Sequence, residues 1–346
     1  MNADQAVRET VAAQLEAGAR SYGAGGAERL TAIEGVGGAF SAWHEFYTQR
    51  VLELSVAVRF DEPLIGGSGF AWSRLGMDAR GAAMPDPTLL VETLRSSLRE
   101  DLSEQAWDLA SLALKSITGP GEPAPDPILR LRPDSGHQTE ALRFLERTLS
   151  GEWREAINEI ARLQREGAPT RVLYERVLLP AAVEMGTMWH LGEIGVSEEH
   201  AATEAILGAM SVLWHQADRS EPNGLRVVVG SVTDDRHSLG VRATAWLLEL
   251  SGCMAACLGS DLPAPDFAQA ARDYEADCVI IGATLVTHVS RTAETIAVLR
   301  RAAPGLRIIV GGPAFGVAPG LAAKVGADAM ARSPGETVKL VTARSA

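Results

Sequence analysis

The C-terminal third of the chain alternates short apolar runs with longer segments in which apolar residues recur every three or four positions. Short apolar runs are typical of buried parallel strands, and the periodic segments are typical of helices that cover such a sheet. The expected strands are residues 225–232, 254–259, 278–285, 307–312 and 327–332. The expected helices are residues 238–251, 263–275, 291–302, 318–324 and 335–343. This alternation predicts a doubly wound, flavodoxin-like α/β domain over residues 221–346, with five parallel strands in the order 2-1-3-4-5.

The segment upstream of this domain has helical periodicity. Leu142, Leu145 and Leu149 recur at the spacing that marks the inward face of a helix. We expect Ser197 to cap the last helix of the segment, because its hydroxyl can accept a backbone N–H at a helix start. The expected helices are residues 138–149, 152–166, 169–190 and 198–218. They predict a four-helix bundle over residues 137–220.

The pattern of residues 1–118 predicts an all-helical domain. The expected helices are residues 4–20, 38–59 and 87–117. Glycine-rich stretches are expected to separate or break them at residues 23–26, 35–38 and 66–69. Its aromatic residues predict a helical core, and they are Trp43, Phe46, Tyr47, Phe60, Phe70, Trp72 and Trp107. A proline- and glycine-rich linker, residues 119–136, is expected to follow in an extended conformation.

Composition narrows the location and the partners of the chain. A length of 346 residues leaves room for these domains, and no apolar run is long enough to span a bilayer. The N-terminus lacks the order of a signal peptide, so we expect a cytoplasmic protein. The net charge of −12 disfavours direct DNA binding. Cys253, Cys257 and Cys278 have neither redox nor zinc spacing and are expected to be buried free thiols.

A D-x-H-x-x-G motif, formed by Asp235, His237 and Gly240, directly follows the first expected strand. It therefore lies at the carboxyl edge of the sheet, where open α/β sheets bind ligands. There His237 can offer one ring nitrogen to a metal while the other donates to the Asp235 carboxylate. The same three residues also fit an ordinary polar loop in which Gly240 eases helix packing.

Two further turns lie at the same edge. Thr284 ends the third expected strand, and Gly311 and Gly312 end the fourth. The Thr284 hydroxyl can form a hydrogen bond to a ligand, and glycines let a ligand approach the backbone. Each glycine taken singly fits a strand-to-helix turn equally well.

A second cluster is expected at one end of the bundle. Trp189 and His190 would end the third helix, and Glu199 and His200 would begin the fourth. The short connection 191–196 brings these residues together, facing whatever lies beneath the bundle. Taken singly, the tryptophan also fits a bundle core, the glutamate a partner of the helix dipole, and the histidines solvated helix ends.

Residues 224–343 resemble the cobalamin-binding domain shared by methionine synthase, the B12-dependent mutases and the corrinoid photoreceptors. The resemblance implies that His237 binds cobalt from below in place of the cofactor's own base, with Asp235 behind it. It also implies that the displaced nucleotide tail threads between the sheet and its helices. The residues expected beside the cofactor are Gly240, Thr284, Gly311 and Gly312.

The spacing W-x9-E-H resembles the cap of the CarH/LitR-type B12 photoreceptors. It implies that Trp189 packs against the adenosyl group of adenosylcobalamin and that Glu199 and His200 contact the sugar and the corrin edge. His190 is then expected to become the upper cobalt ligand after light breaks the cobalt–carbon bond. The resemblance implies a light sensor that forms a homodimer or homotetramer and signals to an output domain or a separate protein.

The order of the domains resembles the photocobilins, which are B12 photoreceptors that also bind biliverdin. No cysteine precedes residue 253, so the implied bilin would bind non-covalently to the helical domain, which is of globin-like size. Arg50, Arg59 and Arg74 are candidates for holding propionates, and His44 for contacting a pyrrole or ligating haem. The same residues fit surface charges and a helix histidine. A haem-binding globin-like sensor and a purely structural domain remain open alternatives.

Two other classes of cobalamin protein share part of this plan. A corrinoid carrier of methylcobalamin for a methyltransferase would have the same bundle and sheet, although the bulky Trp189 counts against it. A B12-dependent mutase requires a barrel of roughly 250 residues, which does not fit in residues 1–118. We therefore expect no enzymatic activity in this chain.

Overall fold

The computed structural model describes residues 3–81, 84–118, 131 and 136–343. The chain forms two compact units. The N-terminal unit comprises residues 1–128 with 317–324, and the C-terminal unit comprises residues 129–316 with 325–346. The expected linker at 119–136 lies almost entirely outside the described residues. None of the helices within the described ranges is both long and apolar enough to cross a membrane.

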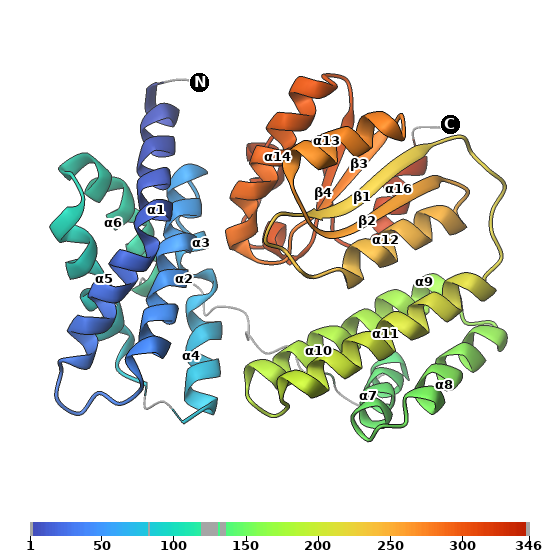
Figure 1. The fold of residues 1–346 in the computed structure, drawn as a ribbon, viewed down its shortest axis with the longest axis horizontal. Helices are drawn as coiled ribbons and strands as arrows, with labels where there is room; N and C mark the ends of the chain where they lie inside the picture. The colour runs from blue at the N-terminus through green and yellow to red at the C-terminus, as the bar shows by residue number, and fades with distance from the viewer. Residues whose placement is uncertain (1–2, 82–83, 119–130, 132–135, 344–346) are drawn as a thin grey trace. The chain divides into compact units, whose positions relative to one another are not determined.

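The N-terminal unit is helical, as predicted (Figure 1). Its helices are α1 (Ala3–Thr31), α2 (Phe40–Arg59), α3 (Ile65–Ser68), α4 (Phe70–Ala79), α5 (Pro87–Asp101) and α6 (Glu104–Thr118). The expectation of a single helix over 87–117 is wrong. Leu102 is extended between α5 and α6, and the Ser103 hydroxyl accepts the N–H of Ala106 at the start of α6. A serine that satisfies a free N–H at a helix start explains the break.

The expected break at glycines 23–26 is also wrong, because α1 continues through them. A Cβ atom on Gly23 would lie 2.5 Å from the hydroxyl oxygen and 2.8 Å from the backbone nitrogen of Thr48 in α2. A Cβ atom on Gly26 would lie 3.1 Å from the Tyr47 ring. These glycines therefore allow α1 and α2 to pack closely, and the contact between the helices outweighs the low helix propensity of glycine.

Substitution of Gly23 by alanine tests this packing. Helix propensity alone would make the protein more stable by about 1 kcal/mol. Because the added methyl group meets the backbone of Thr48, we expect a loss of about 1–3 kcal/mol instead. Urea unfolding followed by circular dichroism measures the difference. Gly37→Ala is the control, since a Cβ atom there has nothing within 4 Å; a Gly23→Ala protein as stable as this control would contradict the prediction.

The bundle predicted at the start of the C-terminal unit is confirmed. It contains α7 (Gly136–Leu149), α8 (Trp153–Arg165), a long third helix, and α11 (Val196–Gln216). The third helix consists of α9 (Thr170–Leu173), a π-helical turn (Tyr174–Leu178) and α10 (Leu179–His190). Pro180 is the second residue of α10, two positions after the last residue of the π-helical turn. Proline has no N–H to donate and its ring crowds the carbonyl four residues before it, so a wider turn accommodates it without ending the helix.

The expected cap of the fourth helix is wrong by two residues. The helix α11 begins at Val196, so the cap position is Gly195 rather than Ser197. The backbone N–H of Gly195 donates to the Glu198 carboxylate at 2.7 Å. An acidic side chain that reaches back to the cap residue therefore closes this helix start.

The sheet has the predicted parallel topology, with the strands in the order β2-β1-β3-β4-β5. The strands are β1 (Arg226–Val232), β2 (Met254–Leu262), β3 (Cys278–Gly282), β4 (Arg307–Gly311) and β5 (Ala329–Ala331). The helices are α12 (Leu239–Leu250), α13 (Ala264–Asp273), α14 (Val289–Ala302) and α16 (Pro334–Thr342); α15 (Leu321–Lys324) follows β4 in the chain but belongs to the N-terminal unit. Helices α12 and α16 cover one face, and α13 and α14 cover the other (Figure 1). All three cysteines are free, with Cys257 only partly buried.

Helix α12 belongs to both the sheet domain and the bundle. Its residues Val241 and Ala245 pack into the core beside the sheet, whereas Ala243 and Leu247 are part of the bundle core. The rings of Trp214 in α11 and Trp246 in α12 stack with centroids 5.6 Å apart. The bundle is therefore fixed against the sheet domain through this helix, and α16 adds a second contact, since the Gly335 N–H donates to the Glu175 carboxylate at 2.7 Å.

Candidate functional site

The loop that follows β1 holds Asp235 in a fully buried position. The N–H of Asp235 donates to the Val232 carbonyl, and its own carbonyl accepts the Ser231 hydroxyl at 2.8 Å and the Asp261 N–H at 2.9 Å. The preceding Asp234 has a φ of +71°, a left-handed conformation that aspartate tolerates better than most residues. This turn keeps the Asp235 carboxylate inside the protein.

The two oxygens of that carboxylate have partners from two loops. Oδ1 accepts hydrogen bonds from Nδ1 of His237 at 2.8 Å and from its backbone N–H at 3.1 Å. Oδ2 accepts the backbone N–H of Thr284 at 2.8 Å and lies 3.4 Å from Nδ1 of His288. Thr284 and His288 follow β3, which pairs with β1. The loops after two neighbouring strands therefore meet at one buried carboxylate.

These contacts shift the pKa values of both partners. Burial alone would raise the pKa of Asp235, but the hydrogen bonds from His237 and His288 outweigh it, and the pKa lies well below its ordinary range. The hydrogen bond to Asp235 raises the pKa of His237, and the charges of Asp235 and Glu199 add to the rise against the opposing effect of burial. The pair therefore favours an ionised carboxylate beside a basic imidazole.

The geometry leaves one nitrogen of His237 for a ligand. A carboxylate can only accept, so Nδ1 carries the proton that it shares with Asp235. In the neutral ring Nε2 then holds the lone pair that a metal requires. The side chain of His237 is 58% exposed, so a ligand can reach it. The expected contact between Asp235 and the His237 ring is present, and it leaves Nε2 available to a metal.

The bundle contributes Glu199 to the same region. Glu199 lies in the first turn of α11, close enough for its charge to affect the pKa of His237. Its Oε1 accepts the Thr203 hydroxyl at 3.0 Å, and its Oε2 lies 3.5 Å from Nε2 of His200, whose side chain is 74% exposed. The structure therefore brings the bundle residues Glu199 and His200 to the side of the bundle that faces the histidine of the sheet domain.

Trp189 and His190 form the last two residues of α10, as predicted, and residues 191–195 connect them to α11. Trp189 is 41% exposed, which excludes a role as bundle core. Two other large apolar side chains are exposed, Val196 at the start of α11 and Leu285 next to Thr284 in the loop after β3. Large apolar side chains that gather on a surface are typical of one that a ligand or partner covers.

The predicted glycines have different roles. At Gly240, the first turn of α12, a Cβ atom would have nothing within 4 Å, so space for a ligand is present. A Cβ atom on Gly312, whose φ is +105°, would lie 2.2 Å from the Ala283 carbonyl oxygen, and one on Gly311 would lie 3.1 Å from that of Ala331. Gly311 and Gly312 are therefore needed for backbone packing at the turn after β4.

Sequence patterns missed His288 and Leu285. His288 ends a 3-10 turn (Val286–His288) between β3 and α14, and it is buried beside Asp235. Only its position four residues after Thr284 indicated that it could reach the same sheet edge. Leu285 carries no polar group, and its exposure could not be read from an apolar run that looks like the end of a strand.

The residues expected to hold a bilin are engaged within the N-terminal unit. Arg50 is buried and paired with Glu53 at 2.6 Å, and it also donates to the Gly69 carbonyl and the Ser73 hydroxyl. Arg59 is buried and forms ion pairs with Glu9 and Glu16. Arg74 lies over the ring of Phe70 in a cation–π contact. His44 lies 3.0 Å from the Arg20 carbonyl oxygen through Nε2. These side chains stabilise the helical unit.

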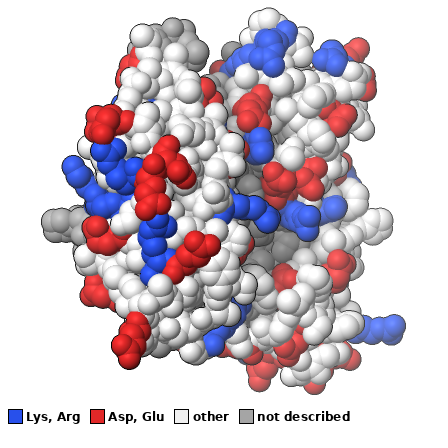
Figure 2. All heavy atoms as spheres, turned by 60° about the vertical axis from the view of Figure 1, so that its left-hand side comes forward, with Lys and Arg blue, Asp and Glu red and all other residues white. Residues whose placement is uncertain are grey.

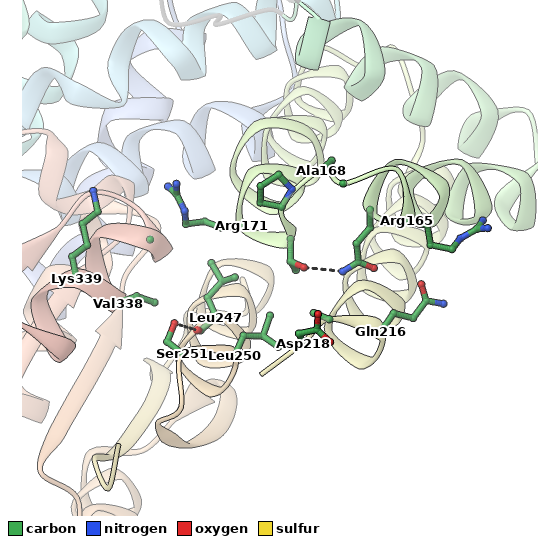
Figure 3. Close-up of a pocket in the computed structure, with 16 residues that line it drawn as sticks. Arg165, Ala168, Arg171, Gln216, Asp218, Leu247, Leu250, Ser251, Val338 and Lys339 are labelled. Atoms are coloured by element: carbon green, nitrogen blue, oxygen red, sulfur yellow. Dashed lines mark hydrogen bonds between the residues drawn. The ribbon is translucent and has the colours of Figure 1, made fainter. Parts of the chain in front are cut away.

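A pocket of about 580 Å³ lies elsewhere in the C-terminal unit, between the bundle and the sheet domain (Figure 3). Its lining comes from the connection between α8 and α9, the end of α11, and parts of α12 and α16. Arg171 and Lys339 are on the same rim, and Asp218 lies on another side. None of the residues at Asp235 or at the end of α10 lines this pocket.

Comparison with known proteins identifies both parts of the C-terminal unit. Residues 225–341 match the B12 binding domain, and residues 141–213 match a second B12 binding domain. Both regions are B12-binding domains. The matches support a cobalamin-binding protein, in agreement with the exposed imidazole of His237, whose Nε2 is available to a metal.

Two curated relatives are similar to part of the chain. The chain is 29% identical over 151 residues to the HTH-type transcriptional repressor CarH of Myxococcus xanthus, which covers 42% of this chain and 48% of the repressor. It is 26% identical over 164 residues to the dimethylamine corrinoid protein 3 of Methanosarcina acetivorans, covering 46% of this chain and 76% of that protein. The chain thus spans about half the length of the repressor.

A solved structure has the same fold. The monomethylamine corrinoid protein of Methanosarcina barkeri is matched with a TM-score of 0.50 and 18% sequence identity. The match covers 59% of this chain and 98% of that protein. The arrangement of helical bundle and parallel sheet is therefore that of a corrinoid protein.

Substitution of Asp235 by asparagine tests the electrostatics of the site. The carboxylate raises the pKa of His237, so its removal is expected to lower that pKa toward the ordinary value of about 6.5. A proton NMR titration of the histidine ring in the cofactor-free protein measures the change. The exposed His215 is the internal control, and an unchanged pKa of His237 would show that its charge partner is another group.

Proposed function

We propose that this protein is a light sensor that binds adenosylcobalamin between the bundle and the carboxyl edge of the sheet. The observation that carries the proposal is the exposed indole of Trp189 in the last turn of α10, which residues 191–195 connect to α11, the helix whose Glu199 acts on His237. A large apolar side chain at this place suits a bulky upper ligand such as the adenosyl group. The similarity to CarH over the cobalamin-binding region supports the same function.

The residues present fit this cofactor. His237 would offer Nε2 as a ligand for cobalt, and Asp235 fixes the ring through Nδ1. The open space at Gly240 leaves room beside the histidine. Trp189, Val196 and Leu285 provide exposed apolar surface for the faces of a large macrocycle.

When bound, adenosylcobalamin supplies a cobalt–carbon bond that light breaks. His237 would hold the cobalt through Nε2, and Asp235 keeps the proton on Nδ1 so that the lone pair stays on Nε2. Trp189 would shield the bundle side of the cofactor from water, and Glu199 and His200 would contact the sugar of the adenosyl group. In the illuminated protein, His190 would bind cobalt from the bundle and so hold the bundle in a second position.

The shared helix α12 gives this rearrangement a route through the protein. Because Ala243 and Leu247 belong to the bundle core, a shift of the bundle also acts on the sheet domain. We propose that this shift alters contacts in a homo-oligomer, or with a separate output protein or domain. Acidic and basic side chains are interspersed over the face shown in Figure 2, without an extended basic area. With a net charge of −12, this favours a protein partner over DNA.

A methyl carrier is the alternative function. The chain covers 76% of the dimethylamine corrinoid protein, and the bundle-and-sheet fold is that of another corrinoid protein of methylamine metabolism. Such a carrier would hold methylcobalamin under the same bundle and present it to a methyltransferase. The bulk of Trp189 above the cofactor favours the light sensor.

Biliverdin is a separate matter, because the side chains first expected to hold it already have partners within the N-terminal unit. We keep biliverdin as a possible second chromophore, and the experiment below tests it by adding biliverdin to the protein. Its binding at Arg50, Arg59 and His44 would require these ion pairs and the hydrogen bond to open. No other feature of the described N-terminal helices favours a haem.

The first test separates the two functions. The protein is loaded with adenosylcobalamin in the dark, and its absorption is recorded before and after green light. We expect the alkyl–cobalt spectrum to disappear together with a change in oligomeric state, measured by size-exclusion chromatography with light scattering. Methylcobalamin-loaded protein and added biliverdin form the parallel arms. A spectrum and assembly unaffected by light, with methyl transfer to a methyltransferase partner, would establish the carrier instead.

Two alanine substitutions separate the proposed ligands. His237→Ala is expected to remove the protein imidazole from cobalt in the dark, with roughly a 10–100-fold loss of affinity. His190→Ala is expected to leave dark binding intact and to remove the two-imidazole spectrum after illumination. Absorption spectra and equilibrium binding measure both effects, and His215→Ala is the matched control. An unchanged photoproduct in His190→Ala would assign the upper position to another residue.

A further inference from the structure

The pocket between the bundle and helices α12 and α16 has no part in the proposed function (Figure 3). Its volume of about 580 Å³ lies within the range of about 300–1,000 Å³ that is usual for small-molecule sites. As far as the described residues define it, the lining includes no strand residue and none of the residues proposed to hold cobalamin. The pocket therefore has room for a second ligand, apart from the cofactor.

The charged side chains around this pocket are mostly basic. Three are basic and one is acidic, and they are Arg165, Arg171, Lys339 and Asp218. The whole chain has a net charge of −12, so a basic excess around a pocket is contrary to its average composition. Within the described part of the chain, the Lys339 ammonium group has no ion pair or hydrogen bond. The lining therefore favours an anion.

Arg171 is held in place on the rim that it shares with Lys339 (Figure 3). Its Nη1 donates to one oxygen of Glu175 at 3.1 Å, and the other oxygen of Glu175 accepts the Gly335 N–H at 2.7 Å. A guanidinium group has five N–H donors, so the contact with Glu175 leaves others for a ligand. An oriented guanidinium and an unpaired ammonium on one rim suit a carboxylate, which can accept from both.

Apolar side chains line the pocket from both parts of the C-terminal unit. Leu247 and Leu250 belong to α12, and Val338 belongs to α16. Ala168 lies in the connection between α8 and α9, and Ala217 follows α11. An apolar ligand body in this pocket would contact both the bundle and the helices of the sheet domain.

Hydrogen bonds hold the walls of the pocket in position. The Gln164 amide Nε2 donates to the Thr170 hydroxyl oxygen at 2.7 Å and to the Leu213 carbonyl at 2.8 Å, which ties the α8–α9 connection to α11. The contact of Gly335 with Glu175 ties α16 to the π-helical turn. Walls that are already ordered lose little conformational freedom when a ligand binds, so less of the binding free energy is lost.

We infer that this pocket is an effector site for a small organic anion that has one carboxylate and an apolar body. The carboxylate binds Arg171 and Lys339, and the body packs against Leu247, Leu250 and Val338. Because the walls come from both the bundle and the sheet domain, the ligand stabilises the arrangement of the two that fits it. Its binding is then linked to that of cobalamin, and this linkage rests on the proposed binding of cobalamin between the same two parts.

Isothermal titration calorimetry with 2-naphthoate tests the site. The neutral 2-naphthamide has the same apolar body, and inorganic phosphate has charge without that body. In adenosylcobalamin-loaded protein in the dark, we expect 2-naphthoate to bind about 10–100-fold more tightly than either, because only it uses both the basic rim and the apolar walls. If 2-naphthamide or phosphate binds as tightly as 2-naphthoate, the assigned ligand chemistry is wrong.

Substitution of Lys339 by glutamine locates the binding. We expect Lys339→Gln to weaken 2-naphthoate binding about tenfold and to leave 2-naphthamide binding unchanged. Lys115→Gln is the matched control, since it makes the same change of charge at an exposed position of α6 in the N-terminal unit. A Lys339→Gln protein that binds 2-naphthoate like the parent, or a Lys115→Gln protein that is weakened equally, would overturn the site.

The effector role is tested by comparing cobalamin-free and adenosylcobalamin-loaded protein in the dark. We expect the affinity for 2-naphthoate to differ about fivefold or more between the two forms, and saturating 2-naphthoate to change the affinity for adenosylcobalamin by the same factor. Lys339→Gln should reduce this second effect at the same 2-naphthoate concentration. Equal affinities in the two forms would overturn the effector role.

The two proposals fail in different ways. If the protein takes up no cobalamin, the proposed function is wrong, whereas binding of 2-naphthoate and its dependence on Lys339 can still be measured in the cobalamin-free protein. If cobalamin binds and is photolysed but 2-naphthoate does not bind, only the effector site is wrong. Thermal unfolding of Lys339→Gln shows whether a loss of binding reflects a loss of folded protein.

Discussion

The buried carboxylate of Asp235 is the contact on which the arrangement of the site depends. A charge in the interior is tolerated only when its hydrogen-bonding capacity is used, and here both oxygens have donors from the loops after β1 and β3. The requirement works in both directions. The donors keep the carboxylate ionised, and the carboxylate holds the two loops together at the edge where His237 emerges. The same hydrogen bonds therefore set both the position of the two loops and the charge of Asp235.

The second constraint is the packing of α12. One side of this helix completes the core beside the sheet, and the other completes the core of the bundle. Helix α12 also begins immediately after the loop that carries Asp235 and His237. Helix α12 thus begins next to His237 and packs into the core of the bundle that faces His237. Interiors packed this densely do not deform smoothly, so a change at one end favours a discrete rearrangement over a gradual one.

Much of this fold could be predicted from the sequence, because strongly periodic patterns decide it. The five strands, their order and the four bundle helices follow from alternating apolar runs and glycine turns. Errors arose where a residue has two uses. Gly23 and Gly26 resemble a helix break but serve helix packing against Thr48 and Tyr47. Helix starts at Glu104 and Val196 depend on a single side-chain contact each, which no pattern specifies.

The site was predictable to the extent that its residues are neighbours in the sequence. Asp235 and His237 form a contiguous motif, and their contact is present as expected. His288 is 53 positions beyond Asp235 and comes close only because β1 and β3 pair in register. The arginines of the N-terminal unit show the reverse case. Arg50 and Arg59 have the right chemistry for a propionate, but the fold provides carboxylates for them.

The π-helical turn at Tyr174–Leu178 has a mechanical consequence for the helix that ends at Trp189. An extra residue in one turn interrupts the regular ladder of backbone hydrogen bonds, so the two halves of the helix need not move as a single rod. The start of the turn is anchored, since the hydroxyl of its first residue, Tyr174, donates to the Met210 carbonyl at 2.6 Å. The part of the helix that carries Trp189 can therefore move without moving the anchored part, and the π-helical turn acts as the hinge between them.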